Sequence, residues 1–224
     1  MSTQHFKLAA AYDAAYQHQD FLNHLDGLWQ EVGDTPVRTV NRLASRYFSK
    51  DVPLRFVDVG CGTGRDLVVF SKLLSESGFA YAQFSGCEIS LVAVEKCRAR
   101  GLTVEHCDAE SLIERTDDPI SIVWANGSLI HLTDEEIAPA ISLLVAKIVP
   151  RGILGIGFKA GDGRRLKDPA DKTCNVDRET TYFQFDMIAS LIQRNGLEIQ
   201  ASISVPSSGR PVSHQYAWII ASKL

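Results

Sequence analysis

No apolar run in this 224-residue sequence approaches the roughly 20 residues that a membrane-spanning helix needs. Residues 1–20 also lack the basic and then apolar pattern of a signal peptide. Basic residues are not in excess, since 23 Lys and Arg residues stand against 27 Asp and Glu residues, for a net charge of −4. These absences disfavour a membrane protein and a dedicated nucleic-acid binder, and they predict a cytoplasmic protein.

The cysteines form no CxxC pair, and their number is odd. They are Cys61, Cys87, Cys97, Cys107 and Cys174. No group of carboxylates marks a metal-dependent site either. We therefore expect reduced thiols, no disulfide framework and no metal.

Strand patterns are missing from the first 50 residues. Residues 6–25 are rich in Ala, with apolar and aromatic residues at helical spacing, which predicts a helix. Residues 35–50 predict a second helix, because Thr35 can cap it and Pro36 suits its first turn. Its apolar stripe comprises Val37, Val40, Leu43, Ala44 and Tyr47.

From Leu54 onward, strand patterns alternate with amphipathic helices. Strands are expected at residues 54–60, 82–89, 102–108, 120–126, 153–159, 197–205 and 214–222. Helices are expected at residues 65–78, 90–101, 133–152 and 185–196, with polar connections at 109–119 and 160–184. Strand–helix units build a parallel sheet covered on both faces, and the short last loop reverses one strand. The prediction is an α/β fold with a doubly wound, mostly parallel sheet of seven strands.

A glycine-rich turn follows the first strand. Gly60, Gly62 and Gly64 lie in VDVGCGTGRD, where glycine permits positive φ and lets a ligand approach the backbone. The turn differs from the dinucleotide GxGxxG pattern, and a purely structural turn is the alternative. Glu88 ends the second strand, where a carboxylate can accept hydrogen bonds from ribose hydroxyls. Asp108 ends the third strand, at the adenine end of the same ligand.

Five segments occur in a familiar order: VDVGCGTG, GCEIS, CDAES, IVWANGSLIHL and VPRGILGIGFK. Together they resemble the class I S-adenosylmethionine-dependent methyltransferases over residues 54–224. The resemblance implies a Rossmann-like fold, with a helical lid at residues 1–50 and a methyltransferase domain at residues 51–224. It also implies S-adenosylmethionine as the cofactor and S-adenosylhomocysteine as its product.

The resemblance further implies which residues bind the cofactor. They are Asp58, Gly60, Cys61, Gly62, Gly64, Glu88, Ile89, Asp108, Ala109, Asn126, Tyr12 and Tyr16. By this resemblance, Asp58 and the glycine turn would hold the methionine part and Glu88 the ribose. Ile89 would pack on the adenine, Asp108 would meet its amino group, and Ala109 would offer backbone contacts.

Four of these residues have further or alternative interpretations. Asn126 would face the amino group and the sulfonium of the cofactor. Tyr12 and Tyr16 would belong to the lid helix, although packing within the helix also explains each of them. Asp108 could equally be a turn residue.

The class of methyl acceptor is narrowed mainly by sequence motifs that are absent. No NPPY or DPPY follows the fourth strand, which disfavours methylation of amino groups in DNA bases or glutamine side chains. The nearest resemblance is to small-molecule methyltransferases, and it implies an oxygen or nitrogen acceptor of anionic or aromatic character. Expected substrate residues are Ser128, His131, Lys159, Arg164 and Tyr182. The predicted loop also contains basic residues that could bind a carboxylate or phosphate of the acceptor, or else simply face solvent. They are Arg164, Arg165, Lys167 and Arg178.

His131 is the candidate general base, because a histidine near the fourth strand can remove a proton near neutral pH. The alternative is that it orders the turn into the next helix. Two rival functions remain open from the sequence. One is a methyltransferase that acts on RNA or a protein side chain, and the other is a non-catalytic S-adenosylmethionine-binding module.

Overall fold

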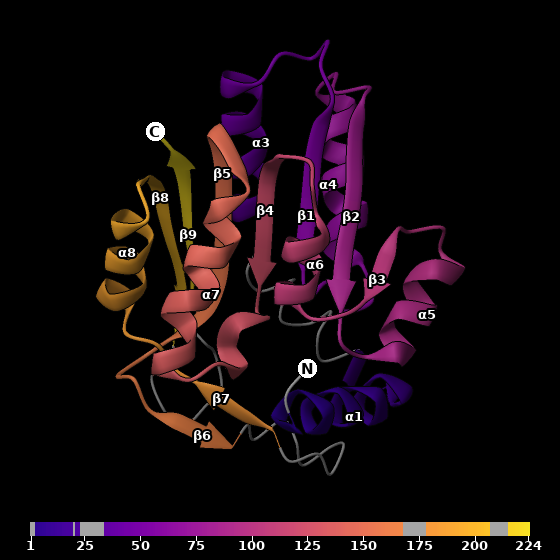
Figure 1. The fold of residues 1–224 in the computed structure, drawn as a ribbon, viewed down its shortest axis with the longest axis vertical. Coiled ribbons are helices and arrows are strands. Elements are labelled where there is room, and N and C mark those ends of the chain that lie inside the picture. Colours follow the sequence, from indigo (N-terminus) through magenta and orange to yellow (C-terminus); the bar gives the residue numbers. More distant parts are fainter. Residues whose placement is uncertain (1–2, 20, 23–33, 168–177, 207–214) are drawn as a thin grey trace.

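The computed structural model describes residues 3–19, 21–22, 34–167, 178–206 and 215–224. At its centre is a seven-stranded sheet in the order β3-β2-β1-β4-β5-β9-β8 (Figure 1). The strands are β1 (Leu54–Val59), β2 (Ala82–Glu88), β3 (Val104–His106), β4 (Ile120–Asn126), β5 (Ile148–Ala160), β8 (Leu197–Pro206) and β9 (Gln215–Lys223). β9 runs antiparallel to both β5 and β8, whereas the other pairs are parallel. The predicted mostly parallel sheet with one reversed strand is confirmed.

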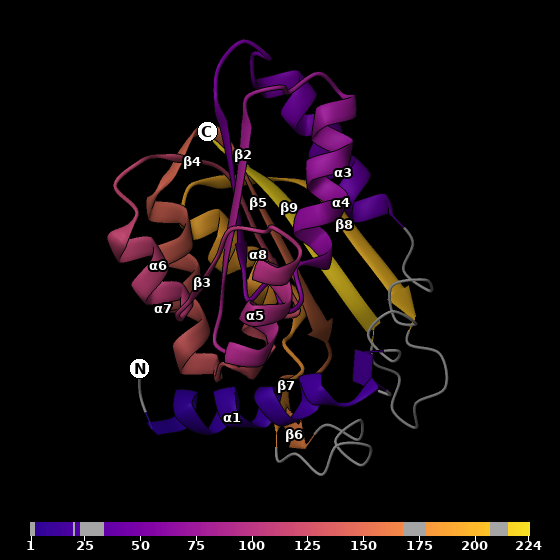
Figure 2. The same ribbon diagram turned by 90° about the vertical axis from the view of Figure 1, so that its right-hand side faces the viewer.

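Helices cover both faces of the sheet, which gives three layers (Figure 2). One face carries α3 (Thr35–Tyr47), α4 (Arg65–Glu76) and α5 (Leu91–Ala99), and the other carries α6 (Ala109–Arg115), α7 (Asp134–Ala146) and α8 (Phe185–Arg194). A short 3-10 helix, η1 (Leu129–His131), follows β4. No helix in the described ranges has the length and apolarity needed to cross a membrane.

Local sequence explains where these helices begin. Thr133 and Glu136 form the expected capping box of α7, with each side chain bonded to the other residue's backbone N–H. The Ser90 hydroxyl accepts a hydrogen bond from the Ala93 N–H at the start of α5. Pro139 lies inside α7, beyond the first four N–H groups that are free in any helix, so its missing N–H removes one intrahelical hydrogen bond.

Two connections contain structure that the sequence pattern did not indicate. The predicted polar connection after β3 holds α6, which Asp108 caps by accepting from the Ser111 N–H and which buries Leu112 and Ile113. The predicted loop at residues 160–184 holds an antiparallel pair, β6 (Arg165–Lys167) and β7 (Glu179–Thr181). Cys174 and the side chain of Lys167 lie outside the described residues.

The two N-terminal helices occupy different places. α1 (Thr3–Gln17) runs across the carboxyl ends of the parallel strands, near β6 and β7 (Figure 2). It is fastened to α5, because the Asp13 carboxylate accepts hydrogen bonds from the Ser90 hydroxyl (2.6 Å) and the Val92 N–H (3.1 Å). α3 instead packs on a face of the sheet through Val40, Leu43 and Ala44.

Candidate functional site

The glycine turn between β1 and α4 is closely packed on two sides. Gly60, Gly62 and Gly64 have φ of 67°, 55° and 77°, which side chains rarely adopt. A Cβ on Gly60 would lie 2.4 Å from Cβ of Ser128, and one on Gly62 would lie 2.7 Å from the Tyr16 hydroxyl. The turn therefore requires glycine both for its backbone and for the contacts that Ser128, which follows β4, and Tyr16 of α1 make with it.

Asp58 lies near the end of β1, directly before this turn. Its side chain is 2% exposed, and its Oδ2 atom has no hydrogen-bond partner among the described residues. Burial raises the pKa of this carboxyl well above its ordinary value, and the neighbouring Asp66 adds to the rise. A buried acid of this kind is suited to bind a cationic group such as the amino group of a methionine moiety.

Glu88 is held at the end of β2, beside the same turn. Its Oε2 accepts a hydrogen bond from the Gly62 N–H at 2.8 Å, and its Oε1 accepts one from the Ser90 N–H at 2.9 Å. Burial raises the pKa of this carboxyl, although the backbone bonds oppose the rise. Each carboxylate oxygen has a second lone pair, so the fixed group can also accept from ribose hydroxyls.

The other predicted cofactor residues lie along the same edge. Ile89 is half-buried, and its carbonyl oxygen lies 3.0 Å from Nε2 of His106. Asp108 caps α6, as the turn interpretation expected, and Ala109 begins that helix. The Cys61 and Cys97 thiols both donate to the Gly62 carbonyl, and contact with Cys97 raises the pKa of Cys61.

Comparison with known proteins agrees with this geometry. Residues 56–152 match a family model described as a methyltransferase domain, and the match covers β1 and the glycine turn through the start of β5. Residues 56–152 therefore resemble a methyltransferase domain. This match, together with the seven-stranded sheet and its one reversed strand, confirms the resemblance to class I S-adenosylmethionine-dependent methyltransferases. No curated protein matches the sequence significantly.

Solved structures share the fold of this chain at low sequence identity. The 1,6-didemethyltoxoflavin-N1-methyltransferase of Burkholderia thailandensis is 19% identical, with a TM-score of 0.58 over 94% of this chain and 88% of that one. The magnesium protoporphyrin IX methyltransferase of Synechocystis PCC 6803 is 20% identical, with a TM-score of 0.57 over 85% and 79%. The cyclase SpnF is 21% identical, with a TM-score of 0.58 over 83% and 80%. Since a cyclase has the same fold, the fold alone does not determine the reaction.

Asn126, at the end of β4, belongs to a buried polar network. Its amide N–H donates to Oδ2 of Asp66 at 2.8 Å, and its carbonyl oxygen accepts from Nε1 of Trp218 at 3.0 Å. Nε1 of Trp124 donates to the same Asp66 oxygen at 2.7 Å. Sequence reasoning missed Asp66. The available signal was the pair of tryptophans on buried strands, because each indole N–H needs an acceptor.

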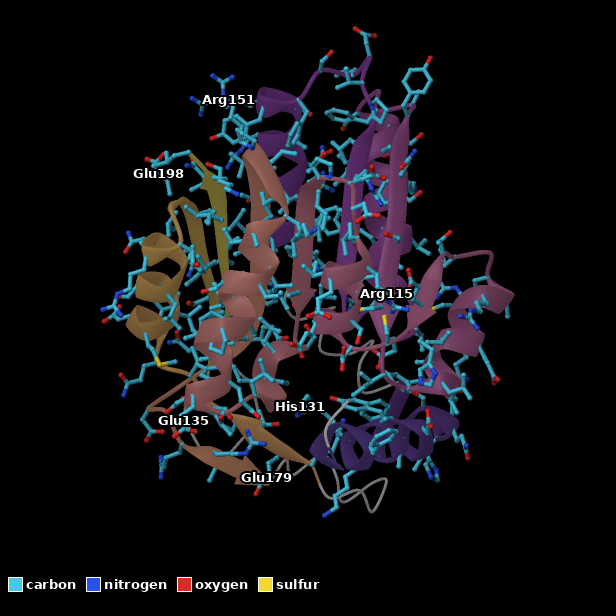
Figure 3. All side chains as sticks on the ribbon, in the orientation of Figure 1. Arg115, His131, Glu135, Arg151, Glu179 and Glu198 are labelled. Carbon is cyan, nitrogen blue, oxygen red and sulfur yellow. The ribbon has the colours of Figure 1, made fainter. Side chains whose placement is uncertain are left out.

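His131 lies on η1, between the carboxyl end of the sheet and α1 (Figure 3). Its side chain is buried. Nε2 lies 2.6 Å from the hydroxyl of Tyr12, and Nδ1 lies 2.8 Å from the backbone oxygen of Glu179. The structure thus brings Tyr12, predicted as a cofactor-lid residue, to the predicted base.

The predicted substrate residues are divided between buried and exposed positions. Lys159 is buried, with its ammonium 5.6 Å from the centre of the Tyr182 ring. Ser128 packs on Gly60, and its hydroxyl has no hydrogen-bond partner in the described part of the chain. Arg164 is exposed and pairs with Asp162 at 2.7 Å, which raises the pKa of its guanidinium.

Among the described arginines around β6 and β7, Arg178 is buried, whereas Arg164 is exposed. Arg178 is 4% exposed, and its guanidinium carbon lies 4.8 Å from the centre of the Tyr12 ring and 5.0 Å from that of Phe21. Arg165 donates to the backbone oxygen of His131 and to the Thr181 hydroxyl. Among the described residues, no group of three or more His, Cys, Asp or Glu side chains could hold a metal ion.

Proposed function

We propose that this methyltransferase moves a methyl group from S-adenosylmethionine to an oxygen or nitrogen atom of a small molecule. In this proposal residues 1–50 form a lid and residues 51–224 the methyltransferase domain. The position of α1 supports this assignment of a lid, because α1 crosses the carboxyl ends of the parallel strands, where open α/β sheets bind their ligands.

The cofactor roles follow from the contacts around the glycine turn. Asp58 and the backbone of Gly60 and Gly62, with Cys61 between them, hold the methionine part, and Glu88 accepts from the ribose hydroxyls. The observation that supports the cofactor is the buried Asp58 oxygen, which has no hydrogen-bond partner among the described residues and lies beside the fixed Glu88 carboxylate. When bound, S-adenosylmethionine supplies an activated methyl group on a sulfonium.

The remaining cofactor contacts are proposed from position along the sheet edge. Ile89 packs on the adenine, the Asp108 carboxylate and the Ala109 backbone contact the base, and Gly64 shapes the turn. Asn126 and Tyr16 then lie on the methionine side. Each polar end of the Asn126 amide has one protein partner in these bonds, which fix its orientation and leave a second N–H and a second oxygen lone pair for the cofactor.

The closed edge above this site favours a small acceptor. Ala15, Tyr16 and Phe21 are buried where α1 and the segment after it cover the glycine turn and α5, so the reacting atom must lie beneath the lid. The Burkholderia structure contains 1,6-didemethyltoxoflavin, a small molecule, with S-adenosylhomocysteine. The buried cations Lys159 and Arg178 support an anionic or aromatic acceptor.

Calorimetry with S-adenosylhomocysteine and with NAD tests the cofactor. We expect binding of S-adenosylhomocysteine and none of NAD, and the reverse result would refute the assignment. Methyl transfer from methyl-labelled S-adenosylmethionine to small phenols, carboxylic acids and N–H heterocycles, compared with RNA and protein, tests the acceptor. Label that appears in RNA or protein rather than in the small molecules would contradict the proposal.

A further inference from the structure

The lid helix and the candidate base are joined by a direct side-chain contact. The Tyr12 hydroxyl lies 2.6 Å from Nε2 of His131, and the two rings meet edge to face with centroids 5.4 Å apart. Tyr12 comes from α1 and His131 from η1, 119 positions later in the chain. The contact therefore depends on α1 lying across the edge of the sheet.

The second nitrogen of the ring fixes its tautomer. A backbone carbonyl can only accept, so Nδ1 carries the hydrogen that is donated to the Glu179 oxygen at 2.8 Å. In the neutral imidazole Nε2 is then the acceptor, and the Tyr12 hydroxyl donates to it. His131 thus presents its basic lone pair to Tyr12.

The short strands β6 and β7 hold His131 in this orientation. Arg165 donates to the His131 carbonyl oxygen at 3.0 Å and to the Thr181 hydroxyl at 2.9 Å. That hydroxyl in turn donates to the Leu132 carbonyl at 2.6 Å. These bonds fasten the backbone of η1, and the Glu179 carbonyl on β7 holds the imidazole, as a general base requires.

We propose that Tyr12 is a catalytic residue that carries the acceptor's proton to His131. The inference rests on the proposed methyl transfer and deepens it. Both ring nitrogens of His131 have partners, so with α1 in place the route from an acceptor to Nε2 runs through the Tyr12 oxygen. The base is complete only while the lid helix contacts η1.

The proton balance of the step is simple. The acceptor atom forms a bond to the methyl carbon as the carbon–sulfur bond breaks, and that electron pair stays on sulfur. The acceptor's proton passes to the Tyr12 oxygen while the Tyr12 proton passes to Nε2 of His131. The ring ends as an imidazolium, with Nε2–H donating to Tyr12 across the same short distance, and it later releases the proton to solvent.

The charge of Arg178 suits this role for Tyr12. Its guanidinium lies over the Tyr12 ring, 4.8 Å from the centre, in a buried position. A cation there stabilises negative charge that develops on the tyrosine oxygen during the transfer. The relay also names the substrate class, namely an acceptor that loses a proton on methylation, such as a hydroxyl group or a ring N–H.

Nuclear magnetic resonance of the His131 ring tests the relay without any acceptor. With S-adenosylhomocysteine bound, we expect Nδ1 to be protonated and Nε2 to be the acceptor nitrogen. Tyr12→Phe keeps the ring but removes the donor, so the Nε2 resonance should move while Nδ1 stays protonated. A ring protonated at Nε2 alone, or an Nε2 signal that ignores Tyr12→Phe, would overturn the proposal.

Kinetics then separate a relay from a simple fastening of α1. With an acceptor from the panel above, Tyr12→Phe and His131→Ala should each lower kcat by about 10²–10⁴-fold. KM for S-adenosylmethionine should stay unchanged. The dependence of kcat on pH should lose the rise to a plateau that a general base produces. Tyr81→Phe, at a 63% exposed side chain, is the matched control and should behave as wild type. Wild-type kcat in Tyr12→Phe, alongside normal S-adenosylhomocysteine binding, would refute the relay while leaving the methyltransferase assignment intact.

Discussion

Asn126 donates a hydrogen bond of 2.8 Å from its amide to the Asp66 carboxylate, which joins the end of β4 to the first turn of α4. The same Asp66 oxygen accepts from the indole of Trp124, and the other end of the Asn126 amide accepts from Trp218 on β9. Three strand-borne groups are thereby tied, directly or through Asn126, to one acid that follows the glycine turn. The network sets the position of β4 relative to the turn that holds the proposed cofactor site.

Asp66→Ala should lower the free energy of unfolding by about 2–4 kcal/mol, because two buried N–H donors would lose their acceptor. Chemical denaturation is the measurement. Asp34→Ala is the matched control, since Asp34 is exposed and makes a surface pair with Arg38, so its loss should change stability by about 0.5 kcal/mol or less. Equal effects of the two substitutions would show that the network contributes little.

Asp58→Asn should stabilise the ligand-free protein while weakening its binding of S-adenosylhomocysteine. The substitution keeps the shape but removes a buried carboxylate oxygen that has no partner among the described residues. We expect a gain of about 1 kcal/mol in unfolding free energy and a loss of about 10- to 100-fold in affinity, the value of a hydrogen bond to a charged group. Denaturation and calorimetry measure the two effects, and a loss of stability with unchanged affinity would contradict the assigned role.

The stability difference between wild type and Asp58→Asn should depend on pH in a defined direction. The pKa of Asp58 is raised in the folded protein, so the folded state holds this proton more tightly than the unfolded chain. Its contribution to stability is full below the ordinary carboxyl pKa of about 4 and is lost as pH rises through the raised value. The advantage of the Asn variant should therefore be small in acid and grow toward neutral pH.

Glu88 should make affinity for S-adenosylhomocysteine fall in acid. Because burial raises its pKa, the carboxylate that accepts from ribose hydroxyls is lost at a higher pH than for an exposed glutamate. Glu88→Gln should bind about tenfold more weakly and lose part of this pH dependence, as calorimetry across pH would show. Glu114→Gln, on the exposed side of α6, is the control and should keep the wild-type profile.

The sequence predicted the features of the fold that have a local signal. Alternating strand and helix patterns gave the parallel sheet, and the short last loop gave the reversed strand. α6 was missed because seven residues carry too little periodicity, and its formation depends on burying Leu112 and Ile113 against the neighbouring helices and sheet. The longer helices and strands could be predicted from the hydrophobic pattern of the sequence, whereas the short ones depend on tertiary packing.

The candidate site was predictable only where residues cluster along the chain. Glu88 and the glycine turn each end or follow a strand, so topology alone brings them to one edge. The contact between Tyr12 and His131 has no such signal, because the path of α1 over that edge decides it. Likewise, the local sequence does not distinguish the exposed Arg164 from the buried Arg178. The path of the folded chain brings only Arg178 of these two against α1.

Gly62→Ala measures how closely the lid contacts the turn. Its φ of 55° imposes strain on any side chain, and the added Cβ would also lie 2.7 Å from the Tyr16 hydroxyl. Tyr16→Phe removes that oxygen and leaves the ring carbon Cζ at 3.6 Å, an ordinary contact. Gly62→Ala should therefore lower the free energy of unfolding less in the Tyr16→Phe background than in wild type. The difference should be about 0.5–1 kcal/mol in a double-mutant cycle measured by denaturation.

Gly101→Ala separates the lid contact from backbone strain. Gly101 has a similar φ of 75°, but a Cβ there would meet nothing within 4 Å. Its substitution should cost stability through strain alone and should be additive with Tyr16→Phe. If Gly62→Ala were additive with Tyr16→Phe as well, α1 would not rest on the glycine turn in solution. The lid could then neither bury the proposed cofactor site nor keep Tyr12 on His131.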